Sequence, residues 1–144
     1  MKNIKVKLID GSQLPNYSTD GAAGADLRSR IGCVINSGES KLIPTGITIS
    51  IPKGYAGFVQ PRSGLALKSG ITVLNTPGLI DSDFRGEIGV ILINHSKEKF
   101  MISIDDRIAQ LVIQKVEHPS FELVDELDVT QRGAGGFGST GVSK

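Results

Sequence analysis

The sequence of 144 residues has little of what many secreted and surface-binding proteins depend on. Its single cysteine, Cys33, excludes an internal disulfide framework and fits a reducing compartment. A net charge of +1 gives no electrostatic reason to expect nucleic acid or a membrane as partner. No apolar run approaches the roughly 20 residues of a membrane span, and the N-terminus alternates like a strand rather than a signal peptide. We therefore expect a soluble protein that is cytoplasmic or otherwise intracellular.

Other common chemistries are missing as well. His95 and His118 have no cysteine or histidine partner at metal-ligand spacing, so a zinc site is not expected. Two histidines in such settings do not support a Ser/His/Asp triad either. The G-x-x-x-x-G-K-[ST] phosphate loop is also absent. The sequence therefore offers neither a zinc hydrolase nor a P-loop enzyme.

The sequence instead contains many short alternating or β-branched runs, separated by breaks rich in Gly, Pro and Asp. This pattern is typical of all-β barrels and sandwiches, including the jelly roll. The strands that it predicts cover residues 4–8, 42–51, 55–60, 71–74, 88–94, 100–104, 108–116 and 120–124. We predict an all-β, jelly-roll-like β-barrel over residues 1–130, followed by a flexible glycine-rich arm over residues 131–144.

One segment, residues 63–70, has the pattern of a short helix. Ser63 is a candidate N-cap and Gly70 stands at the stop position. Because Arg62 precedes the cap, its guanidinium, the Ser63 hydroxyl and the free N–H groups of the first turn would converge. The segment therefore predicts a phosphate site, with an ordinary capped turn and a solvated arginine as the alternative.

The C-terminal segment from Arg132 to Gly141 has five glycines in ten residues, a composition normally disordered. It also carries an arginine, an aromatic ring, two hydroxyls and many unobstructed N–H groups, which suit a polyphosphate and a flat ring. Its G-x-G-x-x-G match is not a dinucleotide fingerprint, because too few residues follow for a helix. We interpret the segment as a mobile arm that closes over a nucleotide; a floppy tail is the alternative.

Three carboxylates are candidates for the chemistry. Asp81 and Asp83 flank a serine in a turn, where acids usually act only as turn formers. In the functional interpretation, one of them takes a proton from water that attacks phosphorus. Asp26 stands among small residues that let a ligand approach, and it could hold Mg²⁺ through water.

Taken together, five blocks resemble, in order, the five motifs of the dUTPase family, the trimeric deoxyuridine triphosphate nucleotidohydrolases. They span nearly the whole chain. The blocks are Ala23-Gly24-Ala25-Asp26-Leu27, Pro61-Arg62-Ser63-Gly64-Leu65-Ala66, Gly78-Leu79-Ile80-Asp81-Ser82-Asp83-Phe84-Arg85-Gly86, Asp106-Arg107-Ile108-Ala109-Gln110-Leu111 and residues 132–141.

The resemblance implies Mg²⁺-dependent hydrolysis of dUTP to dUMP and pyrophosphate, which keeps uracil out of DNA and supplies dUMP for thymidylate synthesis. It makes Asp81 the catalytic base, which activates water for attack on the α-phosphorus. The triphosphate would supply most of the Mg²⁺ ligands, and Asp26 would contact the ion indirectly, through water. The resemblance also implies a homotrimer whose active sites are each shared between three subunits.

The same resemblance implies how the substrate is held. The backbone of a β-hairpin, residues 75–89, would read uracil, and Phe84 would pack against the deoxyribose. Phe137 would stack over the base while the arm reaches the γ-phosphate. The implied substrate-binding residues are Arg62, Ser63, Gly64, Asn75, Gly78, Leu79, Ile80, Phe84, Gly89, Gln110, Arg132, Phe137, Gly138, Ser139 and Thr140.

Two positions depart from the family pattern. Phe84 stands where tyrosine is frequent, and Asp105 stands where glycine is usual; aspartate is among the few residues that tolerate a positive φ. Two alternatives stay open. One is the related dCTP deaminase, which shares the fold, and the other is a non-catalytic nucleotide sensor or protein-binding module.

Overall fold

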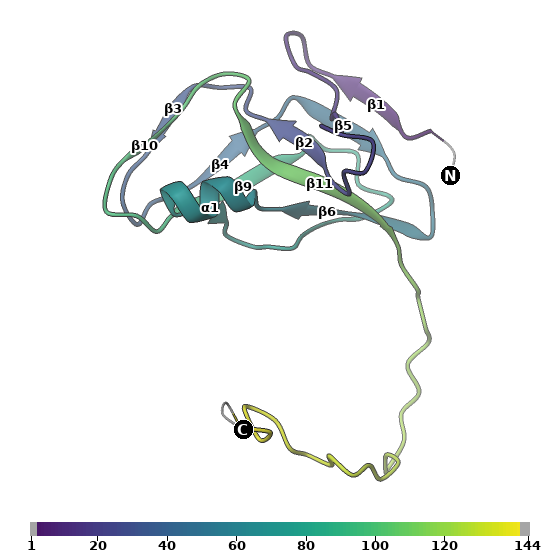
Figure 1. Cartoon of the computed structure of the whole chain (residues 1–144). Helices are drawn as coiled ribbons and strands as arrows, with labels where there is room; N and C mark the ends of the chain where they lie inside the picture. Colours follow the sequence, from purple (N-terminus) through teal and green to yellow (C-terminus); the bar gives the residue numbers. More distant parts are fainter. Residues whose placement is uncertain (1–2, 142–144) are drawn as a thin grey trace.

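Short runs of β-branched residues form the strands of this protein, as the computed structural model shows for residues 3–141 (Figure 1). Residues 1, 2 and 142–144, which belong to the predicted core and arm, lie outside the described residues. In chain order the elements are β1 (Lys5–Leu8), β2 (Ala25–Arg28), β3 (Cys33–Ile35), β4 (Ser40–Pro44), β5 (Ile47–Ser50), β6 (Tyr55–Gln60), α1 (Ser63–Ser69), β7 (Ile71–Val73), β8 (Gly78–Ile80), β9 (Gly89–Asn94), β10 (Phe100–Ile102) and β11 (Arg107–Lys115).

Strand pairing within residues 3–141 is antiparallel and forms four sheets, in the orders β2-β11-β6-β8, β4-β9-β7, β1-β5 and β10-β3. Alternate residues of the strands face inward and meet in one buried cluster. Its members from the two larger sheets include Leu27, Val59, Leu111, Ile43, Ile71, Val90 and Leu92. The all-β class with one short helix in the described part of the chain is therefore confirmed.

Two of the predicted strands were wrong. The run 42–51 is two strands, because the chain turns at Gly46 with a φ of 71° and sends β4 and β5 to different sheets. A side chain at Gly46 would collide with Ser12. Residues 120–124 form no strand, although their apolar and acidic residues alternate. The short strands β2, β3 and β8 were not predicted.

Helix α1 begins one residue earlier than a cap at Ser63 predicts. Arg62 rather than Ser63 is the N-cap residue, and it makes no side-chain cap hydrogen bond. Gly70 ends the helix in the left-handed conformation, with a φ of 63°, and its N–H contacts the carbonyls of Ala66 and Leu65. The predicted stop is therefore confirmed, and the predicted cap is corrected. No helix in the described part of the chain is long and apolar enough to cross a membrane.

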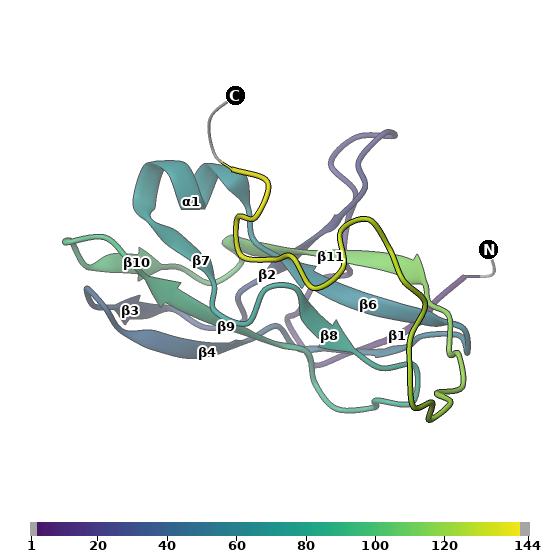
Figure 2. The same cartoon turned by 90° about the horizontal axis from the view of Figure 1, so that it is seen from below.

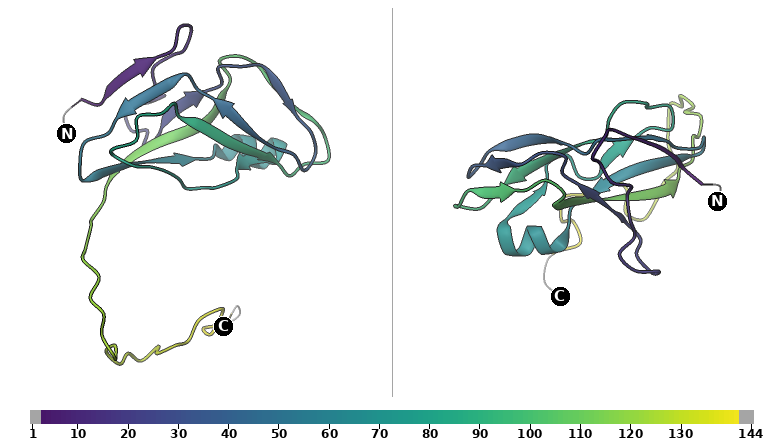
Figure 3. Two further views of the ribbon diagram at one scale, coloured as in Figure 1. Left: turned by 180° about the vertical axis from the view of Figure 1, so that it is seen from behind. Right: turned by 90° about the horizontal axis from the view of Figure 1, so that it is seen from above.

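Beyond β11 the chain leaves the core. Residues 117–141 have no helix or strand, and they run away from the sheets in Figure 1 and in the left view of Figure 3. Large apolar side chains on this segment are almost fully exposed: Phe121, Leu123 and Val129 are each 99% exposed. The segment therefore has no apolar partner within the described part of the same chain.

The buried cluster gives a prediction about stability. Leu92 is fully buried, so Leu92→Ala should lower the free energy of unfolding by about 2–5 kcal/mol through lost burial and a residual cavity. Leu67→Ala is the matched control, because Leu67 on α1 is 87% exposed, and should change it by no more than about 0.5 kcal/mol. Urea denaturation of the three proteins measures both values. Equal effects would contradict this description of the core.

Candidate functional site

A buried carboxylate organises one cluster of the predicted site residues. Asp26 lies on β2 and its side chain is only 9% exposed. Its Oδ1 lies 3.5 Å from Nε of Arg62, while its Oδ2 lies 3.4 Å from Nη1 of Arg107 and accepts a 2.8 Å hydrogen bond from Ser18. Both carboxylate oxygens are therefore occupied by cations or a donor. Asp26 holds two arginines at one place and has little capacity left for direct metal binding.

Strand register brings Gln110 to the same cluster. On β11, Gln110 pairs with Asp26 on one side and with Gln60 on the other. Gly24 lies so close that a Cβ added there would be 2.8 Å from Oε1 of Gln110. The small residues before Asp26 thus make room for the Gln110 side chain. Arg107 belongs to this cluster although the sequence did not single it out; its position in the fourth motif was the available signal.

The start of α1 adjoins this cluster. Arg62 is anchored to β11, because its Nη1 donates a 2.9 Å hydrogen bond to the carbonyl of Arg107. Ser63 and Gly64 follow in the exposed first turn of the helix. A Cβ added to Gly64 would meet nothing within 4 Å, so the space above this turn is open. Two arginines, an amide and exposed N–H groups together form a surface suited to anionic oxygens.

The second group of predicted residues surrounds a small cavity of about 170 Å³. Asp81 is exposed at its edge and Phe84 forms part of its wall. The complete lining is Leu79, Ile80, Asp81, Phe84, Glu87, Ile88 and Gly89, all from one continuous segment. The predicted hairpin over residues 75–89 needs correction. Strand β8 pairs with β6, and β9 pairs with β4 and β7, so the segment passes from one sheet to another instead of closing a ladder.

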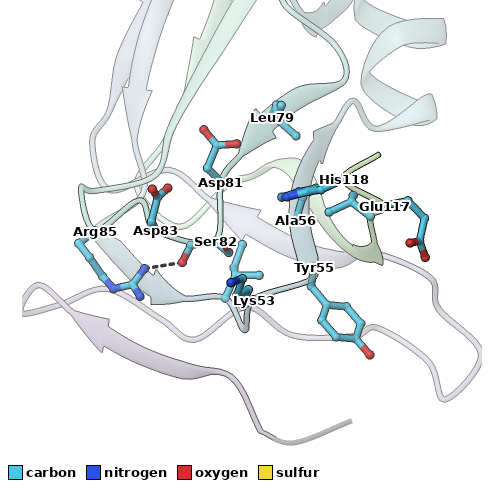
Figure 4. A pocket seen from close by; sticks show the side chains of 12 residues that line it. Lys53, Tyr55, Ala56, Leu79, Asp81, Ser82, Asp83, Arg85, Glu117 and His118 are labelled. Atoms are coloured by element: carbon cyan, nitrogen blue, oxygen red, sulfur yellow. Dashed lines mark hydrogen bonds between the residues drawn. The ribbon is translucent and has the colours of Figure 1, made fainter. Parts of the chain in front are cut away.

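A larger hollow of about 710 Å³ opens beside the same segment and shares Leu79 and Asp81 with the small cavity (Figure 4). Lys53 and Tyr55 contribute from the start of β6, and His118 follows the end of β11. Figure 4 shows the carboxylate of Asp81 next to Leu79, at the end of β8. Asp81 is therefore accessible from both hollows.

Within one chain the two clusters stay apart. Neither hollow at Asp81 is lined by Arg62, Ser63, Gly64 or Gln110. Figure 2 shows α1 beside β7, with β8 farther along the core. The described arm residues contribute to neither hollow.

Two further predicted features have definite positions. Phe137 on the arm is fully exposed, and the side chain of Arg132 donates a 2.8 Å hydrogen bond to the nearby carbonyl of Gly135. Asn75 does not line the small cavity. Its side-chain amide lies next to Gly78, because a Cβ added to Gly78 would be 3.3 Å from Nδ2 of Asn75.

The departure at Asp105 has a clear geometry. Its φ is 69°, so the position does require the left-handed conformation that glycine adopts most easily. Arg28 donates a 2.7 Å hydrogen bond to its carbonyl, and its own N–H bonds to Ser29 at 2.8 Å. The positive φ that the usual glycine at this position indicates is present, and aspartate is among the few residues that adopt it readily.

Sequence comparison relates the chain to known proteins. Residues 10–141 match the model of a family described as dUTPase. The chain is 50% identical over 145 residues to the deoxyuridine 5'-triphosphate nucleotidohydrolase of Fusobacterium nucleatum, covering 98% of this chain and 99% of that protein. It is 55% identical over 139 residues to the protein of the same name from Nautilia profundicola, covering 96% and 98%.

Structural comparison agrees. The fold is similar to the dUTPase of Staphylococcus bacteriophage 80alpha solved with dUPNHPP, with a TM-score of 0.91, 29% identity and coverage of 99% of this chain and 100% of that chain. A mutant dUTPase from phage phi11 of S. aureus, described as revealing the coordination of a structural Mg(II) ion, gives a TM-score of 0.80 at 25% identity, covering 87% and 98%. The similarity confirms the expected jelly-roll-like β fold.

Proposed function

The chain belongs to the dUTPase family and is a dUTP diphosphatase, and we propose that it uses Asp81-activated water and Mg²⁺ to cleave dUTP into dUMP and pyrophosphate. By this reaction it would keep uracil out of DNA and supply dUMP for thymidylate synthesis. The observation that carries the mechanism is the small cavity, which residues of β8 help to line and which has the exposed residue Asp81 in its lining.

The cavity suits a pyrimidine ring because a free strand edge contributes to its lining. Strand β8 ends its sheet, so one edge pairs with β6 and the other offers N–H and C=O groups to a ligand. Gly89 in the lining adds no side chain. Fixed donors and acceptors distinguish uracil from cytosine, since each unpaired buried polar group costs about 1–3 kcal/mol. Discrimination by sites of this type can reach about 10⁴-fold.

Asp81 has the exposure that a general base requires. From the cavity edge its carboxylate would orient a water molecule and accept its proton during attack on the α-phosphorus. Arg62, Arg107 and Gln110 would hold the phosphate oxygens, since Asp26 and the strand register already place them together. Phe84 would pack against the deoxyribose and leave no space for a ribose 2'-hydroxyl.

The side chains near the proposed site fit a Mg²⁺ ion whose ligands come mainly from the substrate. Residues 3–141 contain no group of three His, Cys, Asp or Glu side chains arranged to bind a metal ion. The carboxylate of Asp26 is engaged by two arginines and a serine, which leaves it an indirect role through water. Mg²⁺ bound to the triphosphate would neutralise phosphate charge and hold the chain of phosphates in one geometry.

We propose a homotrimer with shared active sites, because one chain alone does not assemble the site. The Asp81 cavity lacks the phosphate-binding residues, and the arm reaches neither cluster. The exposed Phe121, Leu123 and Val129 support association, since burying each such side chain contributes about 1.5–3 kcal/mol. In this arrangement one subunit supplies Arg62 and Asp26, a second supplies Asp81, and a third supplies the arm.

The test of the proposed function is pyrophosphate release with Mg²⁺ from dUTP, dCTP, dTTP and UTP, measured side by side. We expect release from dUTP alone. Ammonia from dCTP would identify the deaminase branch instead. Binding of dUTP without turnover of any of the four would identify a nucleotide sensor.

A further inference from the structure

The ring of Phe84 rests directly on the backbone of Gly86. A Cβ added to Gly86 would lie 2.5 Å from Cζ and 2.8 Å from Cε2 of the ring. Real Cβ atoms do not come this close to other atoms, so any side chain at this position must displace the ring or the backbone. Gly86 does not have a positive φ, so its backbone conformation is open to alanine. The contact with the ring is therefore what requires glycine.

The backbone at Gly86 is anchored on both sides. Before it, Arg85 donates from Nη1 to the carbonyls of Ser82 at 2.8 Å and Phe84 at 2.7 Å, the first of which is drawn in Figure 4. After it, Glu87 accepts a 2.7 Å hydrogen bond from the N–H of Gly46 and lies 3.8 Å from Nε of Arg30. A new side chain at Gly86 therefore moves the ring rather than the loop.

The next residue ties the loop to the core. Ile88 is buried, its N–H bonds to the carbonyl of Ile47 at 2.7 Å, and its carbonyl accepts a 2.6 Å hydrogen bond from Thr45. The ring of Phe84, in contrast, is 44% exposed. The ring therefore keeps an exposed side towards which it can move.

From this geometry we infer that Gly86 is a specificity-determining positioning residue, which acts through Phe84. The absence of a side chain at Gly86 lets the far end of the ring lie against the loop, in the wall of the small cavity. There the ring closes the space that a 2'-hydroxyl would need. This inference rests on the proposed function, in which Phe84 packs against the sugar of dUTP.

Gly86→Ala tests the inference. We expect the ratio of kcat/KM for dUTP to that for UTP to fall by about tenfold or more, because a displaced ring no longer excludes the hydroxyl. The loss for dUTP should fall mainly on KM, and the melting temperature should stay unchanged. Gly21→Ala is the matched control, since a methyl there meets nothing within 4 Å and the φ is not positive. It should leave the ratio at the value of the unaltered protein.

A double-mutant cycle shows whether Gly86 acts through the ring. In the Phe84→Ala background, adding Gly86→Ala should cause no further change in the dUTP/UTP ratio, because the ring is already gone. Additive effects, or an unchanged ratio in Gly86→Ala alone, would overturn the inference while leaving dUTP hydrolysis intact. Absence of dUTP hydrolysis in the unaltered protein would instead refute the proposed function, on which the inference depends.

Discussion

Asp81→Asn should lower kcat for dUTP by about 10²–10⁴-fold while the dissociation constant for dUTP stays nearly the same. Asparagine preserves the shape of the side chain and its place at the edge of the small cavity. It cannot accept the proton of the attacking water, so the loss falls on the chemical step. Single-turnover measurements of pyrophosphate release, together with equilibrium binding of dUTP to the variant, separate the two effects.

Asp83 supplies the control for this substitution. It is an exposed carboxylate two residues further along the same loop, and it lines the larger hollow but not the small cavity. Asp83→Asn makes the same change in net charge and should alter kcat less than threefold, on the order of what a surface substitution causes. Near-normal turnover in Asp81→Asn, or equal losses in both variants, would remove Asp81 from the role of base.

The fold followed from local pattern where the pattern was long enough. Residues 55–60 form β6 with the predicted bounds, and the run 88–94 forms β9 one residue late. The run 42–51 misled because apolar residues continue on both sides of Thr45 and Gly46, where the chain turns with a φ of 71° at Gly46. Periodicity reports burial, and both halves of that run contribute buried residues, such as Ile43 and Ile47, to different sheets.

For the candidate site, too, some features could be predicted from the sequence and others could not. Four of the residues that the resemblance assigns to substrate binding, Leu79, Ile80, Phe84 and Gly89, line the cavity beside Asp81, and their binding role stays a prediction. Sequence alone did not indicate the role of Arg107, because its partner Asp26 is 81 positions away and reaches it through the β2–β11 ladder. The contact between Phe84 and Gly86 depends on a rotamer, which no sequence pattern reports.

The segment 117–131 shows a limit of a different kind. Its alternation of Phe121, Leu123 and acidic residues predicts a strand, yet residues 3–141 offer it no strand partner and its side chains are exposed. A strand pattern reports only the tendency of a segment, because the strand itself needs a neighbour to pair with. The proposed homotrimer is one source of such a neighbour.

Deleting residues 132–144 should reduce kcat/KM for dUTP by about 10²-fold or more, because the arm no longer contributes Arg132 and Phe137 or excludes water from the site. The melting temperature should not change. Within the described part of the arm, Phe137 is fully exposed, Arg132 bonds to Gly135, and Gly133 bonds to Thr130, just before the deleted residues and outside the sheets. Enzyme assays and thermal denaturation of the shortened chain measure the two quantities. Loss of a cooperative melt would contradict the interpretation of this segment as an arm independent of the core.

Mixing inactive proteins distinguishes a shared site from one formed within a single chain. The Asp81→Asn variant keeps its arm, and the shortened chain keeps Asp81. If base and arm come from different subunits, mixed trimers formed by refolding the two together contain some sites with both parts intact. Activity should then return to a measurable fraction of that of the unaltered protein, while each variant refolded alone stays inactive. If both parts come from the same chain, no mixed assembly contains a complete site, so the absence of recovered activity in trimers proven to be mixed would exclude the shared arrangement.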